Sequence, residues 1–91
     1  MKIKLFFNPD YSATSLWNIN GENLPYKHLP LSLELIKQLE KFDESIFEII
    51  NDNSVSKKCE IYENGLKLFK LVMLELGDKY EVVELLDWIK S

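Results

Sequence analysis

In the first part of the chain Ile3, Leu5 and Phe7 alternate with Lys2, Lys4 and Phe6. From Ile3 to Phe7 every second residue is a large aliphatic or aromatic one, the period-2 pattern of a strand with one buried face. Asn8-Pro9-Asp10 ends this strand, because proline cannot donate to a strand ladder and Asn and Asp favour turns. A second, shorter strand is expected over Leu16–Ile19, and the Asn20-Gly21 that follows suits a tight turn.

Two longer segments repeat their apolar residues at three- and four-residue steps, which is typical of amphipathic helices. The first is expected from about Ser32 to Asn51, with the Ser32 hydroxyl as its N-cap. The second is expected from about Ser56 to Leu76 and ends before Gly77, a residue type that stops helices. The residues 51–54 between them suit a helix end followed by a new cap.

The last segment fits two patterns. Lys79 to Leu86 alternates as a strand does, but Val82, Leu85 and Leu86 also fit helical spacing. We favour a strand over Lys79–Glu84, followed by a short tail with room for one helical turn. The expected fold is therefore α+β, a small β-β-α-α-β domain in which a short sheet packs on an antiparallel helix pair. Ninety-one residues make a single domain, 1–91.

The net charge of −4 is concentrated in one stretch of the chain. No basic residue lies between Lys41 and Lys57, whereas four acidic residues do, and elsewhere eleven acidic residues are matched by eleven lysines. Four carboxylates stand at consecutive i,i+4 steps and should stack along one line of the first helix: Glu40, Glu44, Glu48 and Asp52. Such a face is either a solvated surface or a docking face for a basic partner.

The sequence contains no set of residues that could carry catalysis. His28 is the sole histidine and Cys59 the sole cysteine, and neither has a companion in motif spacing. We therefore expect no catalytic residues, no metal site and no cofactor. Carboxylate pairs such as Asp43 and Glu44 are too common to single out, because adjacent helical residues point in different directions.

Charge and hydropathy also narrow the class of partner and the location. A net negative chain without arginine lacks the clustered basic residues that bind phosphate, so nucleic acid is not expected as a direct partner. No segment approaches the ~20 apolar residues that span a bilayer, and the first residues lack the pattern of a signal peptide. We expect a cytoplasmic protein with no membrane partner.

The tryptophans have two interpretations. Trp17 and Trp88 are either packing residues of a small core or anchors of a binding surface, and the position of Trp88 near the end of the sequence favours exposure more than that of Trp17.

Two groups of residues carry a resemblance to a known class of proteins. Leu29-Pro30-Leu31-Ser32 resembles the helix start of small bacterial LPLS-type α/β proteins, and the segment from Glu75 to Val82 is similar to their closing strand. The resemblance covers most of the chain, and its motifs are structural. Proteins of this kind include immunity proteins of bacterial toxin systems, among them contact-dependent growth inhibition.

The resemblance implies a function that composition does not show. An immunity protein binds a cognate toxin domain, often a nuclease, and blocks it without catalysis. The expected partner-binding residues are the four acidic residues above and a nearby aromatic anchor, Trp88. The acidic residues would steer a basic toxin domain toward the surface.

A second hypothesis of a different class stays open from the sequence. The second helix is apolar on nearly all sides, so the chain could be a self-associating structural or adaptor subunit. Its interface would then consist of Leu71, Leu74 and Trp88.

Overall fold

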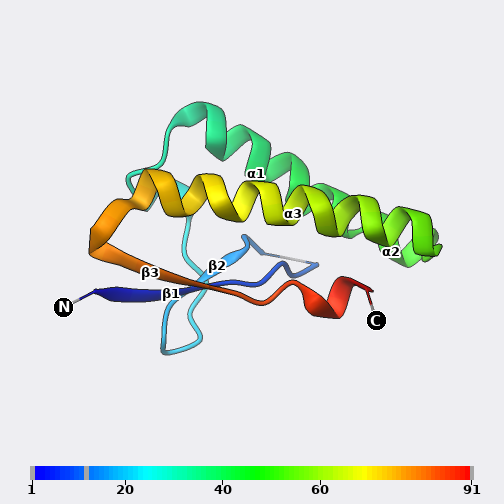
Figure 1. Ribbon diagram of the computed structural model, residues 1–91, viewed down its shortest axis with the longest axis horizontal. Coiled ribbons are helices and arrows are strands. Elements are labelled where there is room, and N and C mark those ends of the chain that lie inside the picture. The colour runs from blue at the N-terminus through cyan, green and yellow to red at the C-terminus, as the bar shows by residue number, and fades with distance from the viewer. Residues whose placement is uncertain (1, 12, 91) are drawn as a thin grey trace.

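Three strands and two long helices form two layers (Figure 1). The computed structural model describes residues 2–11 and 13–90. The elements are β1 (Ile3–Phe7), β2 (Leu16–Trp17), α1 (Leu33–Ile46), α2 (Glu48–Asn51), α3 (Val55–Leu76) and β3 (Tyr80–Glu84). Turns of 3-10 helix cover Tyr26–His28, Gly77–Lys79 and Asp87–Lys90. The β-β-α-α-β order and the α+β class expected from the sequence are confirmed.

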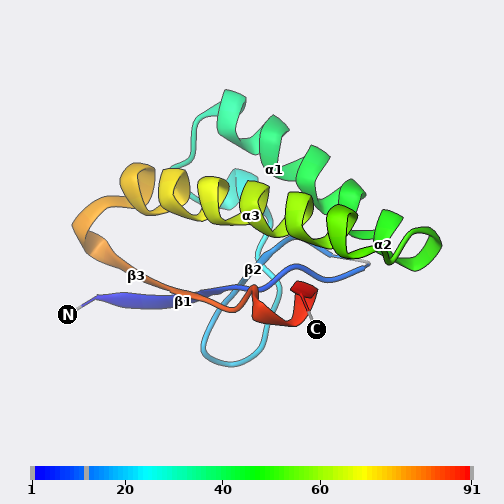
Figure 2. The ribbon, with the colours of Figure 1, turned by 45° about the vertical axis from the view of Figure 1, so that its right-hand side comes forward.

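The sheet has the strand order β2-β1-β3, with β1 in the centre. β1 runs antiparallel to β2, with Phe6 opposite Trp17, and parallel to β3, with Leu5 opposite Val82. A parallel neighbour needs a crossover connection, and the helices supply it. Figures 1 and 2 show α1 and α3 on the same face of the sheet.

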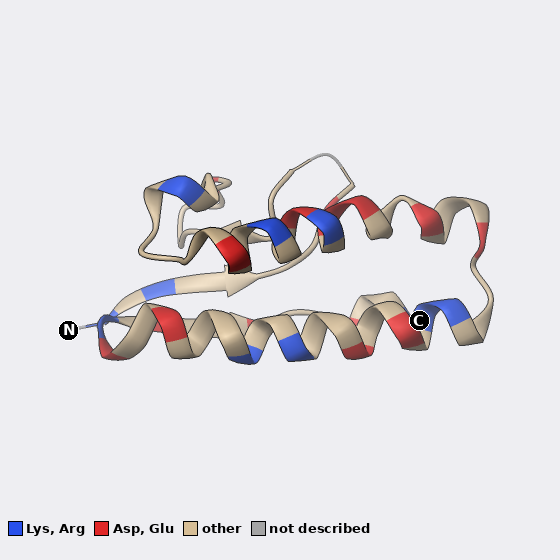
Figure 3. Cartoon of the chain, turned by 90° about the horizontal axis from the view of Figure 1, so that it is seen from above, with Lys and Arg blue, Asp and Glu red and all other residues tan. Residues whose placement is uncertain are grey.

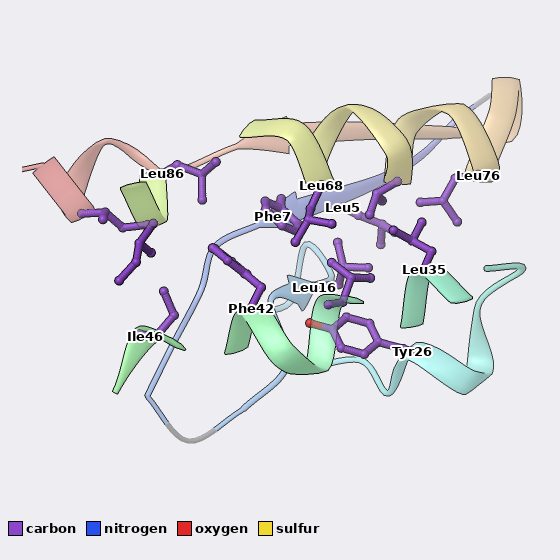
Figure 4. Close-up of a cluster of buried hydrophobic side chains, with 14 of the residues drawn as sticks. Leu5, Phe7, Leu16, Tyr26, Leu35, Phe42, Ile46, Leu68, Leu76 and Leu86 are labelled. Atoms are coloured by element: carbon purple, nitrogen blue, oxygen red, sulfur yellow. The ribbon is translucent and has the colours of Figure 1, made fainter. Parts of the chain in front are cut away.

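The core lies between the sheet and the two helices (Figure 4). Leu5 and Phe7 of β1 are buried, as the period-2 pattern predicts. Phe7 stacks on Phe42 of α1, with 6.1 Å between the ring centroids. Gly65 of α3 lies against the same ring, and a Cβ there would stand 3.0 Å from Phe42 Cζ. The missing side chain therefore lets α3 approach α1 closely.

The ends of both long helices follow the sequence signals. The Ser32 hydroxyl accepts from the Leu35 N–H at 3.1 Å, and the Ser54 hydroxyl accepts from the Lys57 N–H at 3.2 Å. Glu75 of α3 also accepts from the Ser32 N–H and hydroxyl, which ties the start of α1 to the end of α3. Gly77 ends α3 with a backbone φ of +71°, a conformation that residues other than glycine rarely adopt.

The prediction of one continuous helix from Ser32 to Asn51 was wrong, because the helix breaks at Phe47. The Ser45 hydroxyl donates to the Phe42 carbonyl at 2.6 Å, a back-bond that bends helices. The Phe47 N–H then donates to the Glu44 carbonyl at 3.2 Å, a tighter 3-10 type of bond. The line of four carboxylates expected along one helix is therefore interrupted between Glu44 and Glu48.

The closing segment is the strand that we favoured. β3 covers Tyr80–Glu84, which makes the helical alternative for Lys79–Leu86 wrong. The chain then forms one 3-10 turn over Asp87–Lys90. Ile89 of this turn is buried in the core, so the turn packs on the domain.

The residues of the self-association hypothesis do not form one surface. Leu71 is half-buried against the core, whereas Leu74 is 77% exposed. The C-terminal end of α3, which carries Leu74, and the 3-10 turn that carries Trp88 lie at opposite ends of the molecule (Figure 1). The three side chains cannot build a common interface within one copy of the chain.

Candidate partner-binding surface

A shallow groove of about 560 Å³ lies between α1 and the loops that flank β2. We call it the Tyr11–Phe47 groove after the two exposed aromatic residues at its edge. Its described lining residues are Tyr11, Ala13, Thr14, Asn23, Tyr26, Glu40, Asp43, Glu44 and Phe47. Three of these are acidic and none is a lysine. The described lining of the groove therefore combines aromatic surface with three carboxylates and no lysine.

Asp43 is a half-buried carboxylate in the lining of this groove. The Ser15 hydroxyl donates to its Oδ1 at 2.5 Å, and the Tyr26 hydroxyl donates to its Oδ2 at 2.6 Å. Burial raises the pKa of Asp43 to about 6, the two hydrogen bonds oppose that rise, and the charge of Glu40 adds to it. Asp43 is thus an ionisable group held in an environment that disfavours its charge.

Tyr26 connects this carboxylate to the β2 segment. Its hydroxyl accepts from the Ser15 N–H at 2.8 Å while it donates to Asp43. Burial, followed by the neighbouring Asp43 charge, raises the pKa of Tyr26 far above the ordinary tyrosine value. Figure 4 shows the ring of Tyr26 beside α1, with its oxygen toward the core side chains. The network Ser15–Tyr26–Asp43 therefore fixes the loop wall of the groove to α1.

The loop wall has further internal bonds. The Asn23 side chain donates to the Thr14 carbonyl at 2.9 Å, and its oxygen accepts from the Thr14 N–H at 3.2 Å. The Thr14 hydroxyl donates to the Leu24 carbonyl at 2.7 Å. These side-chain bonds add to the backbone bond from the Leu24 N–H to the Leu16 carbonyl of β2 in holding this side of the groove in place.

A row of three aromatic side chains extends along the edge of the groove. Tyr11 lies between Phe47, at 6.1 Å between ring centroids, and Trp88, at 6.0 Å. Phe47 is 50% exposed, and Tyr11 is also exposed. Trp88 is half-buried, and its indole N–H donates to Asn8 Oδ1 at 3.0 Å. The row therefore brings the predicted anchor Trp88 to the acidic side of α1.

The structure divides the predicted acidic residues into two groups. Glu40 and Glu44 are exposed on α1 and line the Tyr11–Phe47 groove. Glu48 forms an ion pair with Lys57 of α3, with 2.8 Å between Oε2 and Nζ, and this contact raises the pKa of Lys57. Asp52 accepts from the Ser54 N–H at 3.1 Å beside the start of α3, and this bond lowers the pKa of Asp52.

Of the residues that line the groove, the sequence predicted only Glu40 and Glu44 as binding residues, and among those it missed are Asp43 and Phe47 of the helix region. Asp43 was set aside as one of many carboxylates, although it stands four residues after Leu39 and three before Ile46, on the apolar face of the helix. That position was a usable signal for a buried polar group. Phe47 also carried a signal, because it stands three residues after Glu44 and seven after Glu40, on the acidic face of the helix.

A second hollow, of about 520 Å³, lies on the other side of α1, between α1 and α3. Its lining also contains acidic residues, namely Glu44, Glu48 and Glu60. Here Lys41 and Lys57 lie among them. Figure 3 shows the same contrast along the helices: α3 carries both signs, whereas acidic residues follow one another from the end of α1 to the turn after α2.

The described residues contain neither a cluster of potential metal ligands nor a helix able to cross a membrane. Within residues 2–11 and 13–90 no group of three or more His, Cys, Asp and Glu side chains is arranged to hold a metal. His28 and Cys59 are both exposed. In the same part of the chain, no helix has the length and apolar character needed to cross a membrane.

A protein-family comparison decides the class of the chain. The family described as Serratia CdiI immunity protein-like matches residues 1–85. The chain belongs to this family. Its membership confirms the resemblance to immunity proteins of contact-dependent growth inhibition. A search of curated proteins found no significant match to this chain.

Proposed function

We propose that this chain is an immunity protein that binds and neutralises a cognate, basic toxin domain, most simply a nuclease, through its acidic surface. Membership of the CdiI-like family supports the immunity role. The observation that carries the acidic surface is the confinement of the net charge to the residues between Lys41 and Lys57. The binding residues proposed are Glu40, Glu44, Glu48, Asp52 and Trp88.

The mechanism is stoichiometric binding rather than catalysis. A nuclease domain carries Lys and Arg around its substrate cleft because it must bind phosphate. An acidic face attracts that cleft over a range of about 8 Å at physiological ionic strength, which raises the association rate. The aromatic row beside the acidic residues then supplies apolar contact area.

A nuclease would act on nucleic acid in the cytoplasm, so its inhibitor is proposed to be cytoplasmic.

The functional test is growth rescue. The C-terminal domain of the protein encoded immediately upstream is expressed with and without this chain, and growth and nucleic-acid integrity are followed. Rescue with co-purification of the two proteins supports the proposal, and the degraded nucleic acid identifies the toxin's chemistry. Continued killing in the presence of this chain would contradict the proposal.

A kinetic test isolates the acidic surface. The triple variant Glu44→Lys, Glu48→Lys, Asp52→Lys should associate about 10- to 100-fold more slowly with the inactive toxin domain, with little remaining salt dependence. A matched control carries the same change in net charge elsewhere: Glu63→Lys, Asp78→Lys and Glu81→Lys. Equal association rates for the two triple variants would overturn the acidic-surface proposal and leave the immunity role standing.

A further inference from the structure

The Tyr11–Phe47 groove has the shape and chemistry of a receptor for one side chain. Its aromatic edge comes from Tyr11 and Phe47, which lie on different segments and meet at 6.1 Å between ring centroids. Glu40, Asp43 and Glu44 enter from one helix. A flat acidic face would attract a basic partner without fixing its position, whereas a groove with a rigid wall fixes a position as well.

Charge and ring chemistry specify the side chain. A guanidinium group stacks on aromatic faces and forms forked hydrogen bonds with carboxylates. The described lining of the groove holds two exposed rings and three carboxylates, and it has no lysine to compete for them. Each Asp43 oxygen accepts one hydrogen bond from within the chain and retains acceptor capacity.

We infer that this groove binds an arginine side chain of the partner protein, with the guanidinium stacked on the exposed rings of Phe47 and Tyr11 and hydrogen-bonded to the carboxylates of Glu40, Asp43 and Glu44. The inference rests on the proposed function for the identity of the partner, a basic toxin domain. It goes further by placing one anchor contact in one groove rather than spreading the contact over the α1–α2 surface.

A proton linkage follows from the position of Asp43. Its neighbours are Glu40 and Glu44 on its own helix, Ser15 and Tyr26 on the β2 side, and, across the groove, Tyr11. None of these is cationic, so burial leaves the carboxylate partly protonated near pH 6. A bound guanidinium favours the ionised form, and its affinity should therefore fall as the pH is lowered through 6.

The first experiment uses L-argininamide as the probe and does not need the toxin. NMR shift changes on titration should centre on Tyr11, Phe47 and the end of α1. Phe47→Ala should weaken binding about tenfold, the size of a partly desolvated cation–π contact. Leu74→Ala, which truncates another exposed apolar side chain, should leave binding unchanged. Shifts spread evenly over all acidic residues, or no effect of Phe47→Ala, would overturn the inference.

The second experiment uses the inactive toxin domain and calorimetry at two pH values. Between pH 7.5 and pH 5 the affinity should fall about three- to tenfold for the wild-type chain, and this loss should disappear in Asp43→Asn. If the toxin binds with the same pH dependence in both chains, the groove assignment falls and the proposed function stands. If argininamide occupies the groove but the toxin domain does not bind, the proposed function falls and the arginine site stands.

Discussion

The two hollows beside α1 differ in how they treat negative charge, although both include Glu44. In the hollow between α1 and α3, Lys57 pairs with Glu48 at 2.8 Å and Lys41 lies among the other lining residues. In the Tyr11–Phe47 groove three carboxylates lie beside aromatic rings without a lysine in the described lining.

The two hollows therefore differ in whether lysines lie among their carboxylates. An exposed ion pair contributes little to stability and offers little net charge to a partner. Carboxylates that lie together without a nearby lysine repel one another and lower the stability of the folded chain. Binding of a cation beside them removes that repulsion. Of the two sides of α1, the groove side is therefore the one suited to a basic partner.

The largest effect is expected from reversing charge on the groove side only. Glu40→Lys with Glu44→Lys should weaken binding of the inactive toxin domain about 100-fold or more, because both attraction and steering are lost. The control variant, Glu60→Lys with Glu63→Lys, changes the net charge by the same amount, but its substitutions lie on α3. Surface plasmon resonance should show only a severalfold loss for this control, and equal losses would erase the distinction between the two sides.

The next effect concerns stability and pH at Asp43. Its pKa is raised to about 6 in the folded chain, so the folded state binds the proton more tightly than the unfolded state. The resulting stabilisation is complete below the ordinary carboxyl pKa and is lost as the pH rises through 6. Between pH 4 and pH 7.5 this contribution should fall by about 2 kcal/mol.

Asp43→Asn isolates that contribution, because the amide is neutral at every pH. Urea unfolding of both chains across this range should give a difference in free energy of unfolding that changes with pH. A constant difference between the chains would show that burial of Asp43 does not shift its titration.

A change in the free energy of unfolding of similar size is expected from Gly65→Ala, between α1 and α3. The added Cβ would lie 3.0 Å from Phe42 Cζ and 3.3 Å from Leu86 Cδ1, closer than ordinary Cβ contacts, so the Phe42 ring or α3 would have to shift. Overpacking of this kind should lower the free energy of unfolding by about 1–2 kcal/mol, partly offset by the better helix propensity of alanine. Binding at the groove should survive. An unchanged or raised stability would show that α3 can move away from α1.

The smallest effect is expected from Lys57→Ala, which removes the exposed partner of Glu48. Chemical unfolding should not distinguish this variant from the wild type, because exposed ion pairs rarely contribute measurably. Toxin association should become slightly faster as Glu48 loses its counter-ion. A large loss of stability would mean that this ion pair holds α2 against α3.

Local signals in the sequence predicted much of the fold. The alternation of apolar residues predicted β1, and the same two-residue period predicted the strand after Gly77, which is β3. Ser32 and Gly77 marked helix ends correctly, because a cap depends on a few neighbouring backbone atoms. Such features are decided within one or two turns of chain.

The site depended on contacts that no local signal contains. The apolar spacing runs without change from Phe42 and Ile46 to Ile49, so it gave no sign that the helix is interrupted at Phe47. Counting charges placed Glu48 with Glu44, although Glu48 pairs with Lys57 across the helix pair. The loop wall at Tyr11 and Tyr26 meets α1 only in the folded chain.

The most direct test of the central claim is carboxyl footprinting of this chain, free and in complex with the inactive toxin domain. Carbodiimide coupling of glycine ethyl ester, read by mass spectrometry, reports which carboxylates the partner covers. The account predicts strong protection of Glu40 and Glu44 in the complex, with Glu63 and Glu81 labelled as in the free chain. Unchanged labelling of Glu40 and Glu44, with protection elsewhere, would contradict it.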